Sequence, residues 1–139
     1  MSQDPLEAII TLLKADAPLA ALVSDRVYGV ELPPSEAETM PRKAVVVRPS
    51  GGPSFASGSF IEHDQQRYDV LGYGETVIEA EKVRRAAFDV FRAVRRSVAS
   101  GTLIHWIEAA GGWATQRESD TAWPLAFQSI TVLYAHQAA

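Results

Sequence analysis

The sequence contains no cysteine, which excludes disulfide bonds and thiolate metal sites. It also lacks an excess of basic charge: 17 acidic side chains outnumber 13 basic ones, for a formal net charge of −4. This balance argues against a surface devoted mainly to nucleic acid, which usually needs a basic domain or a basic stripe. No apolar run approaches the roughly 18 residues of a membrane-spanning helix. The opening residues, MSQDPLEAII, lack the basic region of a secretory signal peptide.

What is present is typical of an ordinary globular protein. Apolar residues make up 47% of the 139 positions and charged residues 22%, which lies outside the range of disordered chains. The length is close to that of a common single domain, which buries roughly two-thirds of its unfolded surface. We therefore expect one domain spanning residues 1–139, made in the cytoplasm and without a membrane anchor.

Two capping signals predict helices. Asp4, Pro5 and Glu7 suit the first turn of a short N-terminal helix. Thr76 and Glu79 form a second capping box, which starts the longest helix, expected to run to about residue 97.

Extended segments are predicted at 44–47, 60–73, 103–107 and 125–134, separated by long loops at about 29–42, 49–59 and 111–123. The first of these strands is β-branched without polar alternation and is expected to be buried on both faces. Strands grouped into hairpins with helices between them indicate an α+β fold. We expect a mainly antiparallel, possibly mixed, sheet with the long helix and the shorter N-terminal helix packed on one face.

Residues that usually carry chemistry are few and scattered. His63, His105 and His136 lie at no metal-ligand spacing, and His105 alternates within an apolar strand, which favours a core or interface position. Ser54 lacks the strand–turn–helix context and the second glycine of a nucleophile elbow. The sequence thus predicts no catalytic residue, no cofactor and no metal site.

The clearest signal for a charged partner is a basic stripe on the long helix. Lys82, Arg85, Arg92 and Arg96 follow helical spacing, with Asp89 among them. The stripe is either a solvated face with internal ion pairs, such as Glu81 with Arg85, or a contact for an acidic neighbour. The neighbour would be another copy of this acidic chain or DNA passing nearby.

Acidic and aromatic side chains provide further interface candidates. Glu62 and Asp64 share one face of a strand that is polar on both sides. A solvated surface is a simpler interpretation of this pair than a cation site or an acid–base pair. Trp113 and Trp123 flank a polar loop and are candidate interface anchors, whereas Trp106 is expected in the core.

Several segments carry a family resemblance in their order along the chain: 5–13, Ala17–Val23, Asp25–Tyr28, Met40–Pro41, Ala44–Val47, Arg67–Gly74 and Ala80–Val83. This order resembles the tail-terminator or tail-completion proteins of long-tailed bacteriophages and gene transfer agents. The resemblance implies a non-enzymatic virion protein at the head-proximal end of the tail. It implies a homo-oligomeric ring, typically a hexamer, that caps the tail tube and docks to the head–tail connector, with DNA passing only through its lumen.

Two other functions stay open at this point. The sequence does not separate a tail terminator from a head–tail adaptor or stopper protein of the connector. A small hydrolase using Ser54 or the Glu62 and Asp64 pair is the third possibility. For the ring, non-identical patches on one subunit are required, because each copy must present a different surface to each neighbour.

Overall fold

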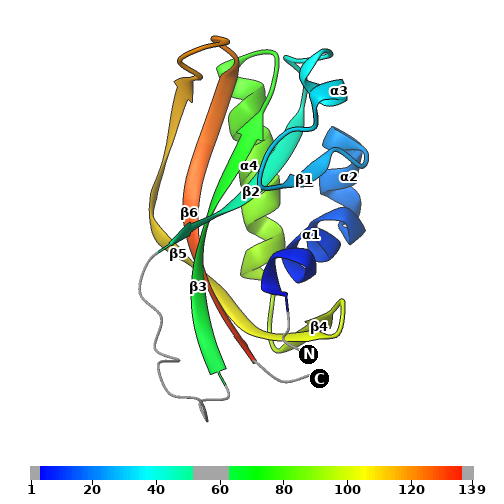
Figure 1. Ribbon diagram of the computed structural model, residues 1–139, viewed down its shortest axis with the longest axis vertical. Coiled ribbons are helices and arrows are strands. Elements are labelled where there is room, and N and C mark those ends of the chain that lie inside the picture. Colours follow the sequence, from blue (N-terminus) through cyan, green and yellow to red (C-terminus); the bar gives the residue numbers. More distant parts are fainter. Residues whose placement is uncertain (1–3, 52–62, 136–139) are drawn as a thin grey trace.

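The computed structural model describes residues 4–51 and 63–135 (Figure 1). Within this part of the chain the elements are α1 (Pro5–Ala15), α2 (Ala17–Val23), β1 (Val27–Gly29), α3 (Pro34–Ala37), β2 (Ala44–Gly51), β3 (His63–Tyr73), α4 (Val77–Arg92), β4 (Ser97–Ala99), β5 (Thr102–Arg117) and β6 (Pro124–Ala135). The strands form one sheet in the order β1-β2-β3-β6-β5-β4. β1 runs parallel to β2, and all other neighbouring strands are antiparallel. The predicted α+β class is therefore confirmed, with a mixed sheet.

Both predicted caps start helices in the structure. Asp4 Oδ1 accepts hydrogen bonds from the backbone nitrogens of Leu6 (3.0 Å) and Glu7 (3.4 Å). At α4 the backbone nitrogen of Glu79 donates to Thr76 Oγ1 at 3.2 Å. These side chains satisfy N–H groups that have no partner within the helix, so they fix where each helix begins.

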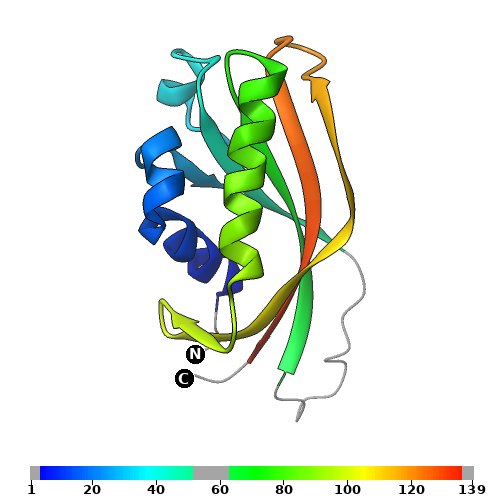
Figure 2. The ribbon, with the colours of Figure 1, turned by 180° about the vertical axis from the view of Figure 1, so that it is seen from behind.

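The main core lies between the sheet and the helices α1, α2 and α4. Figure 2 shows α4 lying along the sheet with α1 and α2 beside it. The largest fully buried side chains include Phe91 of α4, Ile9 and Leu13 of α1, and Ile104 and Ile130 of the sheet. Burial of these apolar side chains provides the main stabilisation of the two layers.

A second, smaller core lies on the opposite face of the sheet, near the end where α3 sits (Figure 1). Its buried members are Ala44, Val46, Leu71, Tyr73 and Leu125, and the partly buried Tyr28, Leu32, Met40, Trp123 and Phe127 pack against them. Together the two cores explain why residues 44–47 of β2 are all buried, as their unbroken apolar run predicted.

The segment 29–42 packs against this second core and contains more regular secondary structure than the loop expected there. It contains α3, and Glu36 of this helix is buried. Arg42 donates two hydrogen bonds to the Glu36 carboxylate, both at 2.7 Å, and the Tyr28 hydroxyl donates a third at 3.1 Å. The bond from Arg42 is the first cause of the lowered pKa of Glu36. One carboxylate thereby fastens this segment to β1.

Two element boundaries differ from the sequence prediction. The long helix ends at Arg92 rather than near residue 97, because the chain turns and Ser97–Ala99 pair with the start of β5. The loop expected at 111–123 is mostly strand, since β5 continues to Arg117. The glycines at 111 and 112 fall where the register with β6 shifts between Ala109 and Trp113, so a bulge absorbs them without ending the strand.

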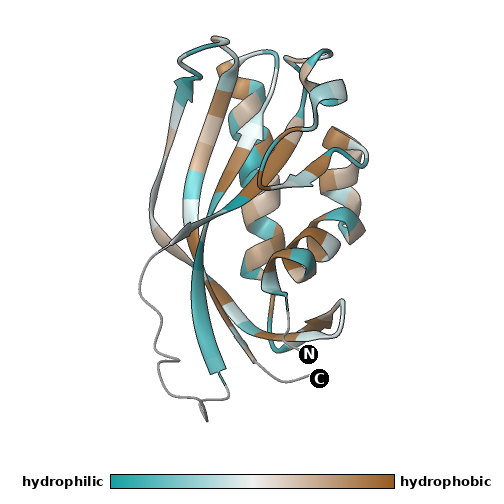
Figure 3. Cartoon of the chain, in the orientation of Figure 1, coloured by the Kyte–Doolittle hydropathy of each residue, from teal (hydrophilic) through white to brown (hydrophobic). Residues whose placement is uncertain are grey.

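β3 extends beyond Arg67, the last residue that pairs with the described part of β2. Among the described residues, His63–Gln66 pair with β6 alone. Figure 3 shows this half of β3 as hydrophilic, at the end of the molecule away from α3. The polar first half predicted for this strand therefore lies beyond the main sheet pairing. The expected 49–59 loop falls partly in β2, which runs to Gly51, and otherwise outside the described residues.

Candidate assembly surface

The outer side of β5 is the longest open edge in the described part of the sheet. β4 pairs only with Thr102–Ile104, and beyond them β6 is the only described strand that pairs with β5. All residues from Gly111 to Arg117 are exposed. Backbone N–H and C=O groups along such an edge are available to a strand of another molecule.

The composition of this edge is unusual for a surface strand. The stretch 109–116, called here the β5 edge, reads AAGGWATQ and contains no charged residue and no proline. Natural proteins usually protect open edges with charges, prolines or covering segments, because unprotected edges pair with other chains. Glu108 and Arg117 carry charge only at its two ends. Apart from the bulge between Ala109 and Trp113, the β5 edge therefore lacks these protections.

A buried cation holds the β5 edge against the body of the domain. Arg84 of α4, which is 5% exposed, donates to both oxygens of Glu81, at 2.6 and 2.9 Å. It also donates to the side-chain oxygen of Gln128 in β6, and its guanidinium lies 4.7 Å from the ring centroid of Trp113. Gln128 in turn donates to the Gly111 carbonyl at 3.4 Å. The edge is thus a supported element with a defined position.

The sequence alone did not reveal the Arg84 cluster. Its partners come from α4, β5 and β6 and are 3 to 44 positions away along the chain. The only local signal is the spacing of three between Glu81 and Arg84.

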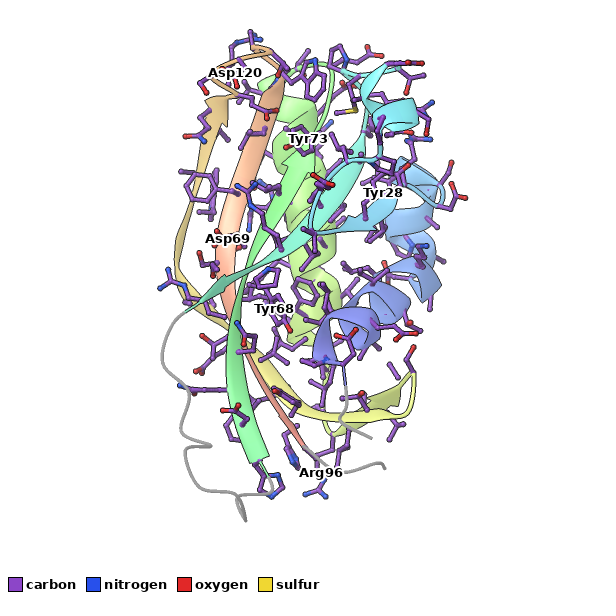
Figure 4. All side chains as sticks on the ribbon, viewed as in Figure 1. Tyr28, Tyr68, Asp69, Tyr73, Arg96 and Asp120 are labelled. Carbon is purple, nitrogen blue, oxygen red and sulfur yellow. The ribbon has the colours of Figure 1, made fainter. Side chains whose placement is uncertain are left out.

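The predicted basic stripe is only partly assembled. Lys82, Arg85 and Arg92 are exposed on α4, and Arg85 lies 3.4 Å from Glu81, so the expected pair with Glu81 is present. Arg96 does not belong to the stripe, because it follows the end of α4 in a left-handed backbone conformation with φ 48°. Figure 4 shows Arg96 at the β4 end of the molecule, away from the middle of α4.

Two of the three tryptophans lie in a different environment from the one expected: Trp106 is exposed, and Trp123 packs in the second core. Trp106, expected in the core, is 50% exposed because it follows the register shift that comes after Ile104. Trp113 is also 50% exposed and lies on the β5 edge. Trp123 is partly buried and meets the ring of Tyr73 edge-on, with 6.3 Å between centroids, so it packs in the second core.

The remaining candidates lie at or beyond the limits of the described residues. Ser54, Glu62 and His136 fall outside them. Asp64 is partly buried, and one of its oxygens accepts a hydrogen bond from the backbone nitrogen of Gln65 at 2.8 Å. The described residues therefore neither assemble nor test the acidic pair that the sequence suggested.

Two histidines that the sequence left separate are brought together. The Nε2 atom of His105 lies 3.1 Å from the Nδ1 atom of His63. Burial, the neighbouring His63 and the charge of Arg96 lower the pKa of His105, in that order. His105, which was expected in the core or at an interface, is partly buried in the single chain.

Across residues 4–51 and 63–135 no three histidine, aspartate or glutamate side chains gather at metal-binding distance. The same residues contain no helix long and apolar enough to cross a membrane. A groove between α1, α2 and α4 is lined mainly by apolar side chains, and its polar lining residues are Asp16, Asp89 and Ser97. Nucleophile, base and oxyanion donors do not converge on it.

The fold occurs in a solved virus-like particle. A chain of the virion of a native gene transfer agent (GTA) particle superposes with a TM-score of 0.66 and 18% sequence identity, over 92% of this chain and 92% of that one. The two chains share one fold. The structure of the bacteriophage SPP1 gp17 protein aligns over 94% of this chain and 86% of its own, at 20% identity and a TM-score of 0.45, too low to support an argument. No protein-family model matches the sequence, and neither does any curated protein.

The sequence resemblance included gene transfer agents, and this chain shares its fold with a chain of a gene transfer agent virion. At 18% identity the likeness concerns the arrangement of the chain rather than individual side chains.

Proposed function

We propose that this chain is a structural, non-enzymatic virion protein that acts as a tail terminator. Copies form a closed ring, with six subunits as the expected number, at the head-proximal end of a tail tube. The ring caps the tube and joins it to the head–tail connector, with DNA passing through the lumen. The fold shared with a virion chain supports a role in a particle of this kind.

The observation that carries the proposal is the β5 edge. Its outer side pairs with no described strand, it carries no charge, and the Arg84 cluster fixes its position. A protein that works alone has no use for such an edge and would be expected to blunt it. A subunit that pairs with its neighbour uses the edge as an interface.

A closed ring also needs a second, different patch. The opposite margin of the sheet provides one, since β1 pairs only with Val45–Val47 and Arg48–Gly51 of β2 are exposed beyond it. The β5 edge of one subunit and the β2 margin of the next form a heterologous pair, which repeats until the ring closes.

The proposal is tested by placing a charge in the β5 edge. Ala114→Lys puts an ammonium on an edge strand, where lysine opposes pairing, and leaves the cores untouched. We expect light scattering and negative-stain images to show rings, alone or on tail tubes, for the natural protein and only single subunits for the variant. Ala21→Lys, at an exposed position of α2, is the matched control and should form rings normally.

Two results would refute the proposal. One is a natural protein that stays monomeric at high concentration and ignores tail tubes. The other is equal assembly by the Ala114 and Ala21 variants, which would remove the β5 edge from the interface. Particles made without the protein separate a terminator from a connector adaptor: overlong or uncapped tubes indicate the former, and normal tails detached from leaking heads the latter.

A further inference from the structure

The histidine pair lies at the end of the sheet opposite the second core. His63 of β3 pairs with Ala135 of β6, and the neighbouring Tyr134 pairs with Ile104 of β5. The strand β6 therefore lies between β3 and β5, and the rings of the two histidines meet across it. The rings are edge-on, with 4.8 Å between centroids and 74° between planes.

We propose that His63 and His105 form a two-histidine binding site for a divalent transition-metal ion of the zinc, nickel and copper class. Imidazole nitrogens bind these ions at about 2.0–2.1 Å, so two of them in tetrahedral geometry lie about 3.3 Å apart. The observed separation of 3.1 Å differs from this by a few tenths of an ångström. Small rotations of the two rings aim both nitrogens at one ion.

A metal ion can replace the hydrogen bond between the two rings without any net gain or loss of protons. In the neutral pair, the N–H group of one ring donates a hydrogen bond to the facing nitrogen of the other ring. When the ion binds, that proton moves to the second nitrogen of its own ring, which leaves a lone pair on each of the two facing nitrogens. Both rings stay neutral, and the ion takes the position of the shared proton.

The surroundings define the class of ion and its strength of binding. No third histidine or carboxylate of the described chain joins the pair, so water or a donor from another molecule fills the other coordination positions. Two neutral nitrogen ligands favour nickel, copper and zinc over magnesium and calcium, which prefer oxygen. The charge of Arg96 acts on His105 and opposes a cation, so binding is expected to be reversible.

Titration calorimetry with NiCl2 and with ZnCl2, on protein that carries no affinity tag, tests the site. We expect one ion per chain and a loss of affinity of roughly a hundredfold in His63→Gln and in His105→Gln, because each removes one of two linked contacts. The double variant should lose little more than either single one. MgCl2 should not bind.

His136→Gln is the matched control, since His136 is the only other histidine of the chain. It should bind nickel like the natural protein. Thermal unfolding of each variant without metal shows that the fold survives, and added nickel should raise the midpoint only where both His63 and His105 remain. Unchanged affinity in either single variant, additive losses in the double variant, or an equal loss in His136→Gln would overturn the assignment. Ring formation is scored separately, so failure here leaves the proposed function untouched.

Discussion

Arg84 and Arg85 are neighbours on α4 that share one carboxylate, and they are expected to differ sharply in their contribution to stability. Arg84 Nη2 lies 2.6 Å from Glu81 Oε1 with its side chain 6% exposed, whereas Arg85 Nη2 lies 3.4 Å from the same atom with its side chain 65% exposed. Arg84 also donates to Gln128 and lies over Trp113. The pair of arginines therefore offers one comparison between a buried and a solvated cation.

The magnitude follows from burial. Arg84→Ala leaves the Glu81 carboxylate largely buried and without its main partner, which costs about 3–5 kcal/mol. The value should fall at the low end, because Arg85 remains beside Glu81. Arg85→Ala removes a solvated ion pair and should cost less than about 1 kcal/mol. A domain with a typical stability of about 5–15 kcal/mol survives both changes.

Urea unfolding measures the difference as a shift in midpoint at constant slope. A double replacement, Arg84→Met with Glu81→Leu, should be less destabilising than Arg84→Ala alone, because it removes both charges at once. The reasoning is refuted if Arg84→Ala costs no more than Arg85→Ala. It is also refuted if the double replacement is as costly as the single one, since the isolated Glu81 charge would then not be the cause.

Two further predictions concern the packing of β3 and the pH dependence of the α3 segment. Gly72→Ala places a methyl group within 2.8 Å of a backbone nitrogen and 2.9 Å of a backbone oxygen of α4, so urea unfolding should show a loss of about 1–3 kcal/mol. Gly112→Ala, which meets no atom within 4 Å, should change stability by less than about 0.5 kcal/mol. Glu36 has a lowered pKa, so its ionised form contributes stability above its unfolded pKa, and that contribution is lost as the pH falls through the folded value. The stability advantage of the natural protein over Glu36→Gln should accordingly be largest near pH 7 and shrink in acid, measured by urea unfolding at several pH values.

Local signals in the sequence were sufficient for most of the fold. The capping residues Asp4 and Thr76 act on the backbone of their own helix, so their roles can be inferred without knowing the tertiary structure. The unbroken apolar composition of residues 44–47 in β2 likewise predicts their burial without knowledge of the tertiary structure. The class and the placement of the helices on one face follow from these local facts and the order of elements.

The features that the sequence did not reveal depend on contacts between distant segments. Two adjacent glycines followed by a polar run predicted a loop, yet β6 supplies the pairing that makes residues 113–117 a strand. The turn after Arg92 removes Arg96 from the helical stripe. His63 and His105 meet only because β6 holds their strands at a fixed register.

The form of the β5 edge also bears on how a chain can carry an open strand edge without charges or prolines on it. An uncharged open edge invites any extended segment, and indiscriminate pairing leads to aggregation. The bulge between Ala109 and Trp113 bends the strand and restricts which partner strand can follow it. Arg84 fixes the position of Trp113, so the edge presents one shape rather than many. The formal net charge of −4 on each copy adds a general repulsion between copies. For the pairing proposed above, we therefore expect selectivity to come from the bend and from the anchor at Arg84, and loosening that anchor should make the pairing less specific even where the edge sequence is unchanged.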